Sequence, residues 1–533
     1  MTDLKEIKDF IESHVSKIKP LSKKCRLAYW NATTTGDEEF YKEYEKLQKD
    51  MEKIFNDRDS FERLKEFNKL KIEDPLIKRQ VEILYRQYLG SQGELGLLNQ
   101  IIEKSTEIEK KFNIFRTEIN GKKLSDNEIK TILKTETNSE KLREAWEASK
   151  KQGKLVERDL IELIKLRNKL ARQLGFSDYY TFSLELSEQK KEDIEKIFND
   201  LDKLTKQEFR KLKEEIDLFL SKKYRILKDE LKPWHYQDLF FQEAPQILEI
   251  NLDQFYSDDI LEKAKEFYND INLSADSILE KGDLYEKEGK YQHAYCIDID
   301  KEGDIRTLMN IRNNEKEMET VLHELGHGIY WKFINKDLPY VLRGPAHIFT
   351  TEAIAQLFGR QSKNASFIER YCNVKKEELK TITKAIRKML KLRQLVFSRW
   401  SQVMINFEKK LYENPEQDLN ILWWDLVKKF QLLNFSRNEP DWASKIHLVS
   451  VPVYYHNYLL GELLASQLTN YLAKNIIKTD SLYNLDYFSN KGVGEYLKKS
   501  IFSPGKTCCW QEFVEKTTGE VLNPAYYAKE FVE

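Results

Sequence analysis

Apolar residues recur at intervals of three and four positions along most of this chain, which is the period of an amphipathic helix. The period is regular across residues 1–135, and it returns after residue 315 and persists almost to the end. It breaks near Gly121 and at Gly175. The pattern therefore predicts a mainly α-helical protein with long helices. The clearest single helices are predicted over 94–113, 139–174 and 190–227.

The stretch between residues 231 and 310 has a different pattern. Apolar and polar residues alternate over 291–300 and again over 304–311, as in half-buried strands. Glu302-Gly303-Asp304 provides a turn between the two runs. We therefore expect a small β-hairpin or sheet near residues 290–312.

The low content of turn-forming residues agrees with this interpretation. The 533 residues include only 19 Gly and 11 Pro, which favours long helices over many short strands. No internal repeat and no linker rich in Gly, Pro or Ser interrupts the chain. We therefore predict one large intertwined helical domain over residues 1–533.

Charge and cysteine content narrow the class of protein. The 88 basic and 89 acidic residues leave a net charge of −1, whereas nucleic-acid binding needs a basic surface. No apolar run reaches the ~18 residues of a membrane span, and the first ten residues do not have the pattern of a secretory signal. Five cysteines without a C-x-x-C spacing suggest reduced thiols. We expect a cytoplasmic protein that binds neither membranes nor nucleic acid.

A metal-binding motif stands in one of the predicted helices, as His323-Glu324-Leu325-Gly326-His327. Histidines four positions apart lie on one helix face about one turn apart, so both imidazoles can reach one Zn²⁺. Glu324 can act as the general base that takes a proton from the attacking water. Because the chain has only 8 histidines, the motif arises by chance with a probability on the order of 1%.

Catalytic zinc needs a third protein ligand. A third histidine at close spacing is absent, because Gly328-Ile329-Tyr330 follows the motif. Glu352 is the obvious alternative, on a second helix that Thr350 or Thr351 would cap, with Glu352 in its first turn. The predicted ligands of one zinc ion per chain are His323, His327 and Glu352.

Further stretches accompany the motif. They are Gln292-His293-Ala294, Asn335-Lys336-Asp337-Leu338-Pro339, Leu342-Arg343-Gly344, Glu352-Ala353-Ile354 and Lys445-Ile446-His447. Together with H-E-x-x-H they resemble the angiotensin-converting enzyme family of zinc peptidyl-dipeptidases, and weaker similarity covers essentially the whole chain. The resemblance implies a zincin-type domain of two intertwined helical halves around a deep central cleft. It also implies a lid-like region at 1–135 and a catalytic core at 230–470.

The same resemblance assigns roles to residues outside the metal motif. His293 and Ala294 match an edge strand that holds an extended peptide by backbone pairing, with the histidine on a substrate carbonyl. Lys445 matches the lysine on the C-terminal carboxylate of the substrate, and His447 matches the histidine that helps to polarise the scissile carbonyl. Gln237 is a candidate for the family's glutamine on the substrate carboxylate.

The family also has two tyrosines three positions apart, one on the substrate carboxylate and one on the oxyanion. Tyr455 and Tyr458 fit this spacing, and we favour Tyr458 as the oxyanion donor. If the alignment with the family is anchored on Pro452, His456 takes the oxyanion position, so the choice between Tyr458 and His456 stays open. Tyr454-Tyr455 and Tyr458-Leu459 also resemble the related thimet oligopeptidase family.

Three positions depart from the family pattern. The chloride-binding arginine is Asn457 or Tyr455, depending on register, so the resemblance gives no support for chloride activation. Gln292 stands in place of a disulfide cysteine, which is consistent with a cytoplasmic protein. Gln356 replaces an acidic residue that supports the zinc histidines, so these must be supported differently.

We therefore expect a zinc-dependent peptidase that releases dipeptides from the C-termini of short peptides. Within the same class, the alternative is an oligoendopeptidase that cuts short peptides internally. From another class, the alternative is an inactive helical peptide-binding protein with a vestigial zinc site. We expect a monomer.

Overall fold

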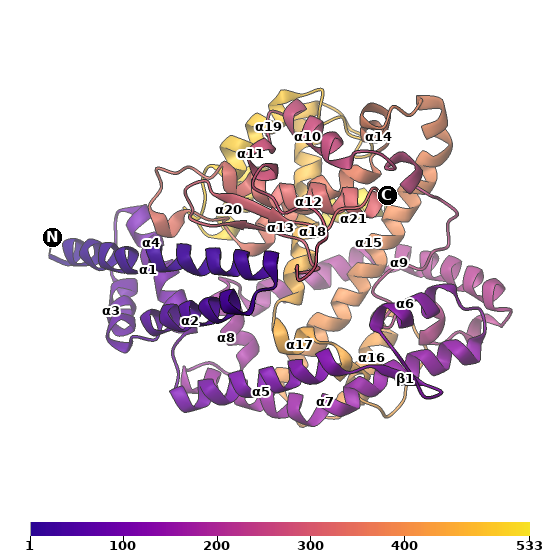
Figure 1. The fold of residues 1–533 in the computed structure, drawn as a ribbon, viewed down its shortest axis with the longest axis horizontal. Coiled ribbons are helices and arrows are strands. Elements are labelled where there is room, and N and C mark those ends of the chain that lie inside the picture. The colour runs from indigo at the N-terminus through magenta and orange to yellow at the C-terminus, as the bar shows by residue number, and fades with distance from the viewer. Residues whose placement is uncertain (1, 533) are drawn as a thin grey trace. The chain divides into compact units, whose positions relative to one another are not determined.

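Long helices form most of the structure, as the spacing of apolar residues predicts. The computed structural model describes residues 2–532, with 69% helix and 3% strand, which confirms the predicted mainly α fold class (Figure 1). Three predicted helices are found with ends within about three residues of those expected. They are α5 (Leu95–Ile114), α7 (Ser139–Gln173) and α9 (Lys191–Tyr224).

Side-chain caps fix where several of these helices begin. Asn138 precedes α7 and accepts a hydrogen bond from the backbone N–H of Lys141. Ser125 and Glu128 form a capping box at the start of α6 (Asp126–Thr135). Such side chains satisfy N–H groups that the first helical turn leaves without a backbone partner. These helix starts are therefore determined by the local sequence.

The chain divides into two compact units, each built from separate stretches of sequence. Unit 1 consists of the chain up to Gln92, Ile250–Lys384 and Leu460–Glu530, and unit 2 consists of Gly93–Glu249, Ala385–Leu459 and the residues from Phe531. Helices α15 (Lys376–Glu413) and α18 (Tyr455–Tyr471) each include a boundary between the units. Within residues 2–532, we find no helix with the length and apolar content of a membrane span.

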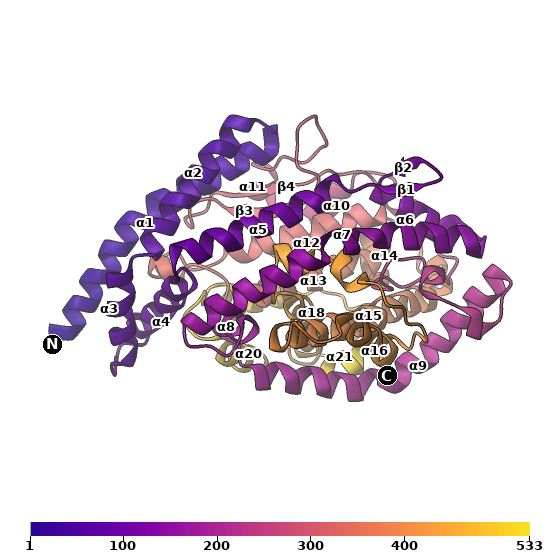
Figure 2. The same ribbon diagram turned by 90° about the horizontal axis from the view of Figure 1, so that it is seen from below.

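Unit 1 holds the N-terminal helices and the predicted metal motif. Figure 2 shows α1 and α2 side by side in this unit, and Figure 1 shows α12 beside α13. The other α-helices of unit 1 are all shorter than α1. The helices are α1 (Thr2–Thr35), α2 (Glu38–Phe55), α3 (Arg58–Lys69), α4 (Pro75–Gly90), α10 (Ile260–Asp270), α11 (Asp276–Leu279), α12 (Glu315–Lys332), α13 (Ile348–Gly359), α14 (Ala365–Tyr371), α19 (Lys491–Tyr496), α20 (Trp510–Thr518) and α21 (Ala525–Phe531).

Unit 2 is built around the long helices α5, α7 and α9. Its other α-helices are α6, α8 (Tyr179–Leu186), α16 (Leu419–Gln431) and α17 (His447–Ser450). It also contains a hairpin of β1 (Thr117–Ile119) and β2 (Lys122–Leu124). The spacing of apolar residues predicts only a break near Gly121 at this place. Asn120 and Gly121 both have positive φ, 52° and 76°, and an Asn-Gly pair between two strands is a hairpin signal that could have revealed it.

The predicted hairpin near residues 290–312 is confirmed in unit 1. Strand β3 (Tyr295–Asp298) pairs antiparallel with β4 (Ile305–Leu308), with Tyr295 opposite Leu308. The hairpin packs against α1 through Trp30, and the Sγ of Cys296 would lie 3.1 Å from a Cβ added to Gly328 of α12. The small sheet is thus held between α1 and the helix with the metal motif.

Candidate functional site

Helix α12 presents both motif histidines on one side. Asn314 caps its first turn, and its buried apolar residues include Val321, Leu325 and Ile329. With these residues in the core, His323 and His327 lie half-buried one turn apart, their ring centroids 4.9 Å from each other. The motif therefore has the geometry that its spacing predicts.

Helix α13 brings the third predicted ligand to the same place, but it begins earlier than predicted. Its N-cap is His347, whose Nδ1 accepts a hydrogen bond from the backbone N–H of Phe349. The prediction that Thr350 or Thr351 caps this helix is wrong, and Glu352 lies in the second turn. An imidazole nitrogen replaces the usual hydroxyl cap, so the helix starts before the two threonines.

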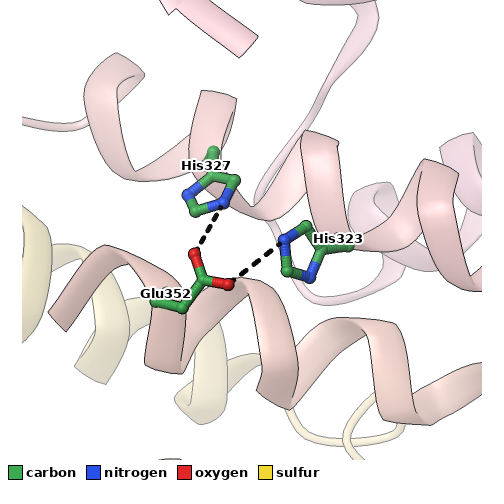
Figure 3. Close-up of side chains that lie close together, drawn as sticks. All are labelled: His323, His327 and Glu352. Atoms are coloured by element: carbon green, nitrogen blue, oxygen red, sulfur yellow. Dashed lines mark ion pairs between the residues drawn. The ribbon is translucent and has the colours of Figure 1, made fainter. Parts of the chain in front are cut away.

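Figure 3 shows His323, His327 and Glu352 turned toward one another from α12 and α13. Glu352 Oε1 lies 3.8 Å from His323 Nε2, and Glu352 Oε2 lies 3.4 Å from His327 Nε2. The three donor atoms lie within 4.8 Å of one another. Zinc ligands at about 2.0–2.1 Å in a tetrahedral site are separated by roughly 3.3 Å, so this donor set fits zinc.

The charges in this cluster favour an ionised Glu352. Burial raises the pKa of its carboxyl group, but the hydrogen bond from His327 and the charges of the two histidines outweigh burial and hold the pKa at about 2. Burial acts to lower the pKa of His327, and the neighbouring Glu352 and Glu324 raise it overall. An anionic carboxylate between two imidazoles is a ready site for a divalent cation.

Two further polar side chains support the ligands. His327 Nδ1 lies 2.8 Å from the hydroxyl oxygen of Thr351, and Gln356 hydrogen-bonds to Glu352. A metal-bound imidazole is commonly oriented by a partner on its second nitrogen. Gln356 predicted altered support for the histidines, but no pattern in the sequence predicted Thr351 as the partner of His327. Thr351 directly precedes the third ligand, and that adjacency is the only sequence signal for it.

Close backbone contacts set the distance between the two ligand-bearing helices. A Cβ added to Gly326 would lie 3.1 Å from Cα of Ala355, which is tighter than normal packing. Gly461 of α18 is also tight, because an added Cβ would lie 3.2 Å from Cβ and Cγ of Glu352. Gly326 thus lets α12 and α13 approach closely enough for the three donors to meet, and Gly461 leaves room for the Glu352 side chain beside α18.

Glu324 follows His323 directly on α12. Its side chain is 8% exposed and belongs to the buried face of the helix. The position is compatible with proton transfer to a reactant at the neighbouring metal ligands.

Unit 2 gathers most of the other predicted site residues around Lys445. The Lys445 ammonium donates a hydrogen bond to Gln242 Oε1 at 2.7 Å and lies 5.1 Å from the Trp400 ring and 5.6 Å from the Tyr455 ring. Within residues 2–532 it forms no ion pair with a carboxylate. Burial lowers its pKa to about 8. Lys445 is therefore a buried cation in direct contact with neutral groups, and the nearby charges of Asp238 and Glu243 favour its charged form without forming an ion pair.

His447 and the tyrosines lie in the same cluster of unit 2. The ring of His447 is 5.3 Å from that of Tyr455, which is 5.5 Å from that of Tyr458. Burial, and then the charge of Lys445, lower the pKa of His447 to about 4. Its Nδ1 is buried without a hydrogen-bond partner in the described part of the chain. The Tyr455 hydroxyl accepts a hydrogen bond from Trp400 Nε1, whereas Tyr458 is half-buried.

The competing residue for the oxyanion role belongs to a different network. His456 Nε2 lies 2.7 Å from Gln189 Oε1, and the amide of Gln189 donates to Asn457. His456 and Asn457 are 2% and 3% exposed, so both are core residues. This packing favours Tyr458 over His456 as the donor.

Gln237 and Gln242 have different surroundings in unit 2. Gln237 accepts a hydrogen bond from the backbone N–H of Gln246, and its amide nitrogen is buried without a partner in the described residues. Among the described residues, the hydrogen-bond partner of Lys445 is Gln242 and not Gln237. Sequence reasoning missed Gln242, because a position five residues from the candidate has no local signal.

His293 and Ala294 lie just before β3 rather than within it. His293 is exposed beside Tyr291, and Ala294 is half-buried. The backbone pairing of Ile299 with Asp304 implies that Ile297 and Tyr295 also face β4. Cys296, between these two, therefore directs its backbone N–H and C=O away from β4.

The helical fold brings two histidines and one glutamate together in a candidate metal site, and the comparison with known families gives its class. The sequence model described as peptidase family M3 matches residues 132–533, about three quarters of the chain. The chain therefore belongs to peptidase family M3. A second sequence model, described as angiotensin-converting enzyme, matches residues 1–224.

These matches confirm the resemblance to the gluzincin peptidases, whose M3 and M2 families are zinc-dependent. The M3 match includes the metal motif and the Lys445 cluster, whereas the angiotensin-converting enzyme match covers only the N-terminal part. No curated protein matches the chain significantly.

Proposed function

We propose that this protein hydrolyses short peptides with one zinc ion per chain and releases dipeptides from their C-termini. Peptide hydrolysis follows from membership of peptidase family M3. The observation that supports the catalytic assignment is the donor triad of His323, His327 and Glu352 with Glu324 beside it on the same helix.

Each residue of the proposed machinery has a defined task. When bound, zinc supplies Lewis acidity toward the scissile carbonyl and the attacking water. Glu324 takes a proton from that water and later returns it to the leaving amine. His447 and Tyr458 donate hydrogen bonds to the oxyanion, in accord with the roles that the resemblance assigns.

Selection of the C-terminus is proposed to rest on Lys445. A buried ammonium group without a carboxylate partner gains most from an anionic ligand, because few solvent contacts compete with it. The carboxylate of a peptide supplies that charge, and Tyr455 and Gln242 provide neutral neighbours around it. We keep Gln237 as a second candidate for this role.

An extended peptide can pair with the edge of β3. The outward N–H and C=O of Cys296 offer one pair of hydrogen bonds, and His293 and Ala294 precede them on the same edge. Addition of a strand to an exposed edge is a common way to bind peptides without strong sequence selection.

An oligoendopeptidase is the second candidate. It is favoured by the longer match, since family M3 is the thimet oligopeptidase family and its model covers residues 132–533. An inactive protein with a structural metal would need a fourth Cys or His ligand. The only donor group found among residues 2–532 has three members, which argues for a catalytic site.

The first experiment replaces the proposed base. Glu324→Gln should lower kcat by about 10³-fold with zinc still bound, because the amide cannot accept the proton. Glu317→Gln, on the same helix, is the matched control and should keep kcat. Hydrolysis of a short peptide and the zinc content of each variant are the measurements. Unchanged cleavage by Glu324→Gln would disprove the mechanism.

The second experiment separates the two peptidase modes. Peptides with a free or an amidated C-terminus are compared by kcat/KM and by mass spectrometry of the products. A carboxydipeptidase should lose at least about tenfold in kcat/KM on amidation, because one charge-assisted contact is removed. Equal rates with internal cuts would establish the oligoendopeptidase.

A further inference from the structure

Two adjoining cavities lie along helices α1 and α2 of unit 1. The larger has a volume of about 540 Å³ and the smaller about 300 Å³, a size range typical of small-molecule sites. Both are lined by Ser22, Arg26, Met51 and Phe55, so the two form one continuous groove. Neither is lined by a residue of the metal cluster.

The groove contains two cations that lack ion pairs. Arg26 lines both cavities, and Lys301 lines the smaller one. Among residues 2–532, neither side chain lies within 4.0 Å of a carboxylate oxygen. Arg26 Nη1 donates to the backbone oxygen of Asp298, and Lys301 has only a long contact of 3.5 Å to the backbone oxygen of Tyr340.

Neighbouring cations in the same part of unit 1 behave differently. Lys19 and Lys23, also on α1, form ion pairs with Glu302 and Asp300 in the turn that carries Lys301. The turn therefore contains two carboxylates, but these pair with Lys19 and Lys23 and not with Lys301. The smaller cavity is lined by no Asp or Glu, and the larger only by Glu52, which forms no ion pair with Arg26.

The backbone holds Lys301 toward the groove. Lys301 has φ of 59°, a left-handed conformation that costs free energy for a residue other than glycine, and its N–H donates to Asp298 Oδ1. Its ammonium group lies 4.7 Å from the centroid of the Tyr340 ring. Burial, with the charges of Lys506 and Arg26 acting in the same direction, lowers the pKa of Lys301 to about 7, so a nearby anion would favour its charged form.

The rest of the groove is largely apolar or aromatic. Tyr29, Tyr44, Met51 and Phe55 line the larger cavity together with Arg26, and Met51 and Phe55 continue into the smaller cavity that Lys301 lines. An anionic head at Arg26 and Lys301 would thus leave room for an apolar body between α1 and α2.

We propose that the groove binds a small organic anion with a carboxylate head, held by Arg26 and Lys301, and an aromatic or aliphatic body against Tyr29, Tyr44 and Phe55. The shape and charge of the site do not depend on zinc, since no metal ligand lines it. The binding is therefore a property of unit 1 that stands whether or not the proposed peptidase mode is correct.

The test uses N-acetyl-L-phenylalanine as the probe and its neutral carboxamide as the matched ligand. Titration calorimetry on the zinc-loaded full chain should show saturable binding of the acid, with the amide at least about tenfold weaker. Lys301→Met and Arg26→Met should each weaken binding of the acid by at least about tenfold. Lys23→Met is the control on the same helix and should change the Kd by less than about twofold.

One competing outcome needs its own variant, because the acid could bind at Lys445 instead. Under the proposal Lys445→Met keeps the probe affinity, whereas loss of binding in Lys445→Met but not in Lys301→Met would overturn it. Absence of saturable binding to the wild type, or equal binding of acid and amide, would also overturn it. If Lys301→Met is unfolded by circular dichroism, Lys301→Gln and Arg26→Met decide the result.

Discussion

Thr351 contacts one of the proposed metal ligands. Its hydroxyl oxygen is 2.8 Å from His327 Nδ1, while His327 Nε2 faces Glu352. For Nε2 to bind zinc with its lone pair, Nδ1 must carry the ring proton and donate a hydrogen bond to the hydroxyl oxygen of Thr351. One hydroxyl thus selects both the ring orientation and the tautomer.

Thr351→Val should therefore weaken zinc binding by about tenfold or more, because the isosteric side chain leaves the imidazole N–H unsatisfied. Thr351→Ser should restore affinity, since it keeps the acceptor. Competition with a chromophoric chelator measures the zinc Kd. Thr350→Val is the control, because Thr350 donates to the backbone oxygen of His347 and contacts neither zinc histidine. Equal affinities of the Val and Ser variants at position 351 would refute the role.

Lys445 makes the proposed C-terminal selectivity dependent on pH. Burial lowers its pKa to about 8, so the ammonium group is present below that pH and is lost as the pH rises through it. We expect kcat/KM for peptides with a free C-terminus to fall above about pH 8. For amidated peptides, kcat/KM should not show this fall. The same decline with both substrates would show that another group titrates.

At the scale of elements, the contact of α12 with α13 determines how the three proposed metal ligands are arranged. Ligands on two helices can meet only if the helices lie at the correct separation, and Gly326 touches Ala355 at their crossing. Added volume at this crossing moves Glu352 relative to both histidines.

Gly326→Ala should lower zinc affinity by about tenfold and destabilise the fold by about 1–3 kcal/mol, because the contact has no room for a methyl group. Gly96→Ala is the control, since an added Cβ there meets only Glu94 Oε1 at 3.9 Å and the alanine favours the helix. Thermal denaturation with and without zinc, together with chelator competition, measures both effects. Wild-type zinc affinity in Gly326→Ala would show that the helices adjust freely.

At the scale of the whole molecule, unit 1 joins segments that are far apart in sequence. Arg360, after α13, pairs with Glu462 of α18 and with Glu530 of α21, and all three side chains are at most 10% exposed. This buried network ties the ligand-bearing helix to the C-terminal part of the chain.

Arg360→Met should cost about 3–5 kcal/mol, because it leaves two buried carboxylates without their partner. Arg370→Met is the matched control, since Arg370 pairs with Asp270 at 2.8 Å but is 51% exposed, and its cost should stay below about 1 kcal/mol. The shift of Tm in thermal denaturation compares the two variants. A small shift for Arg360→Met would mean that the carboxylates rearrange or take up protons.

The sequence alone predicted the long helices, the β3–β4 hairpin and the H-E-x-x-H motif, because each depends on spacing within a short stretch. It also offered Glu352 as the third ligand candidate from its place near the start of a second predicted helix, although it did not identify the residue that caps that helix. Caps such as Asn138 and the four-residue histidine spacing operate within one or two turns, so no distant residue can hide them. Only the tertiary structure decided that Thr351 supports His327, that Gln242 accompanies Lys445 and that Arg26 and Lys301 share a groove. These pairs join segments whose distance in space depends on how helices pack, and side chains that meet this way leave no periodic signal in the sequence.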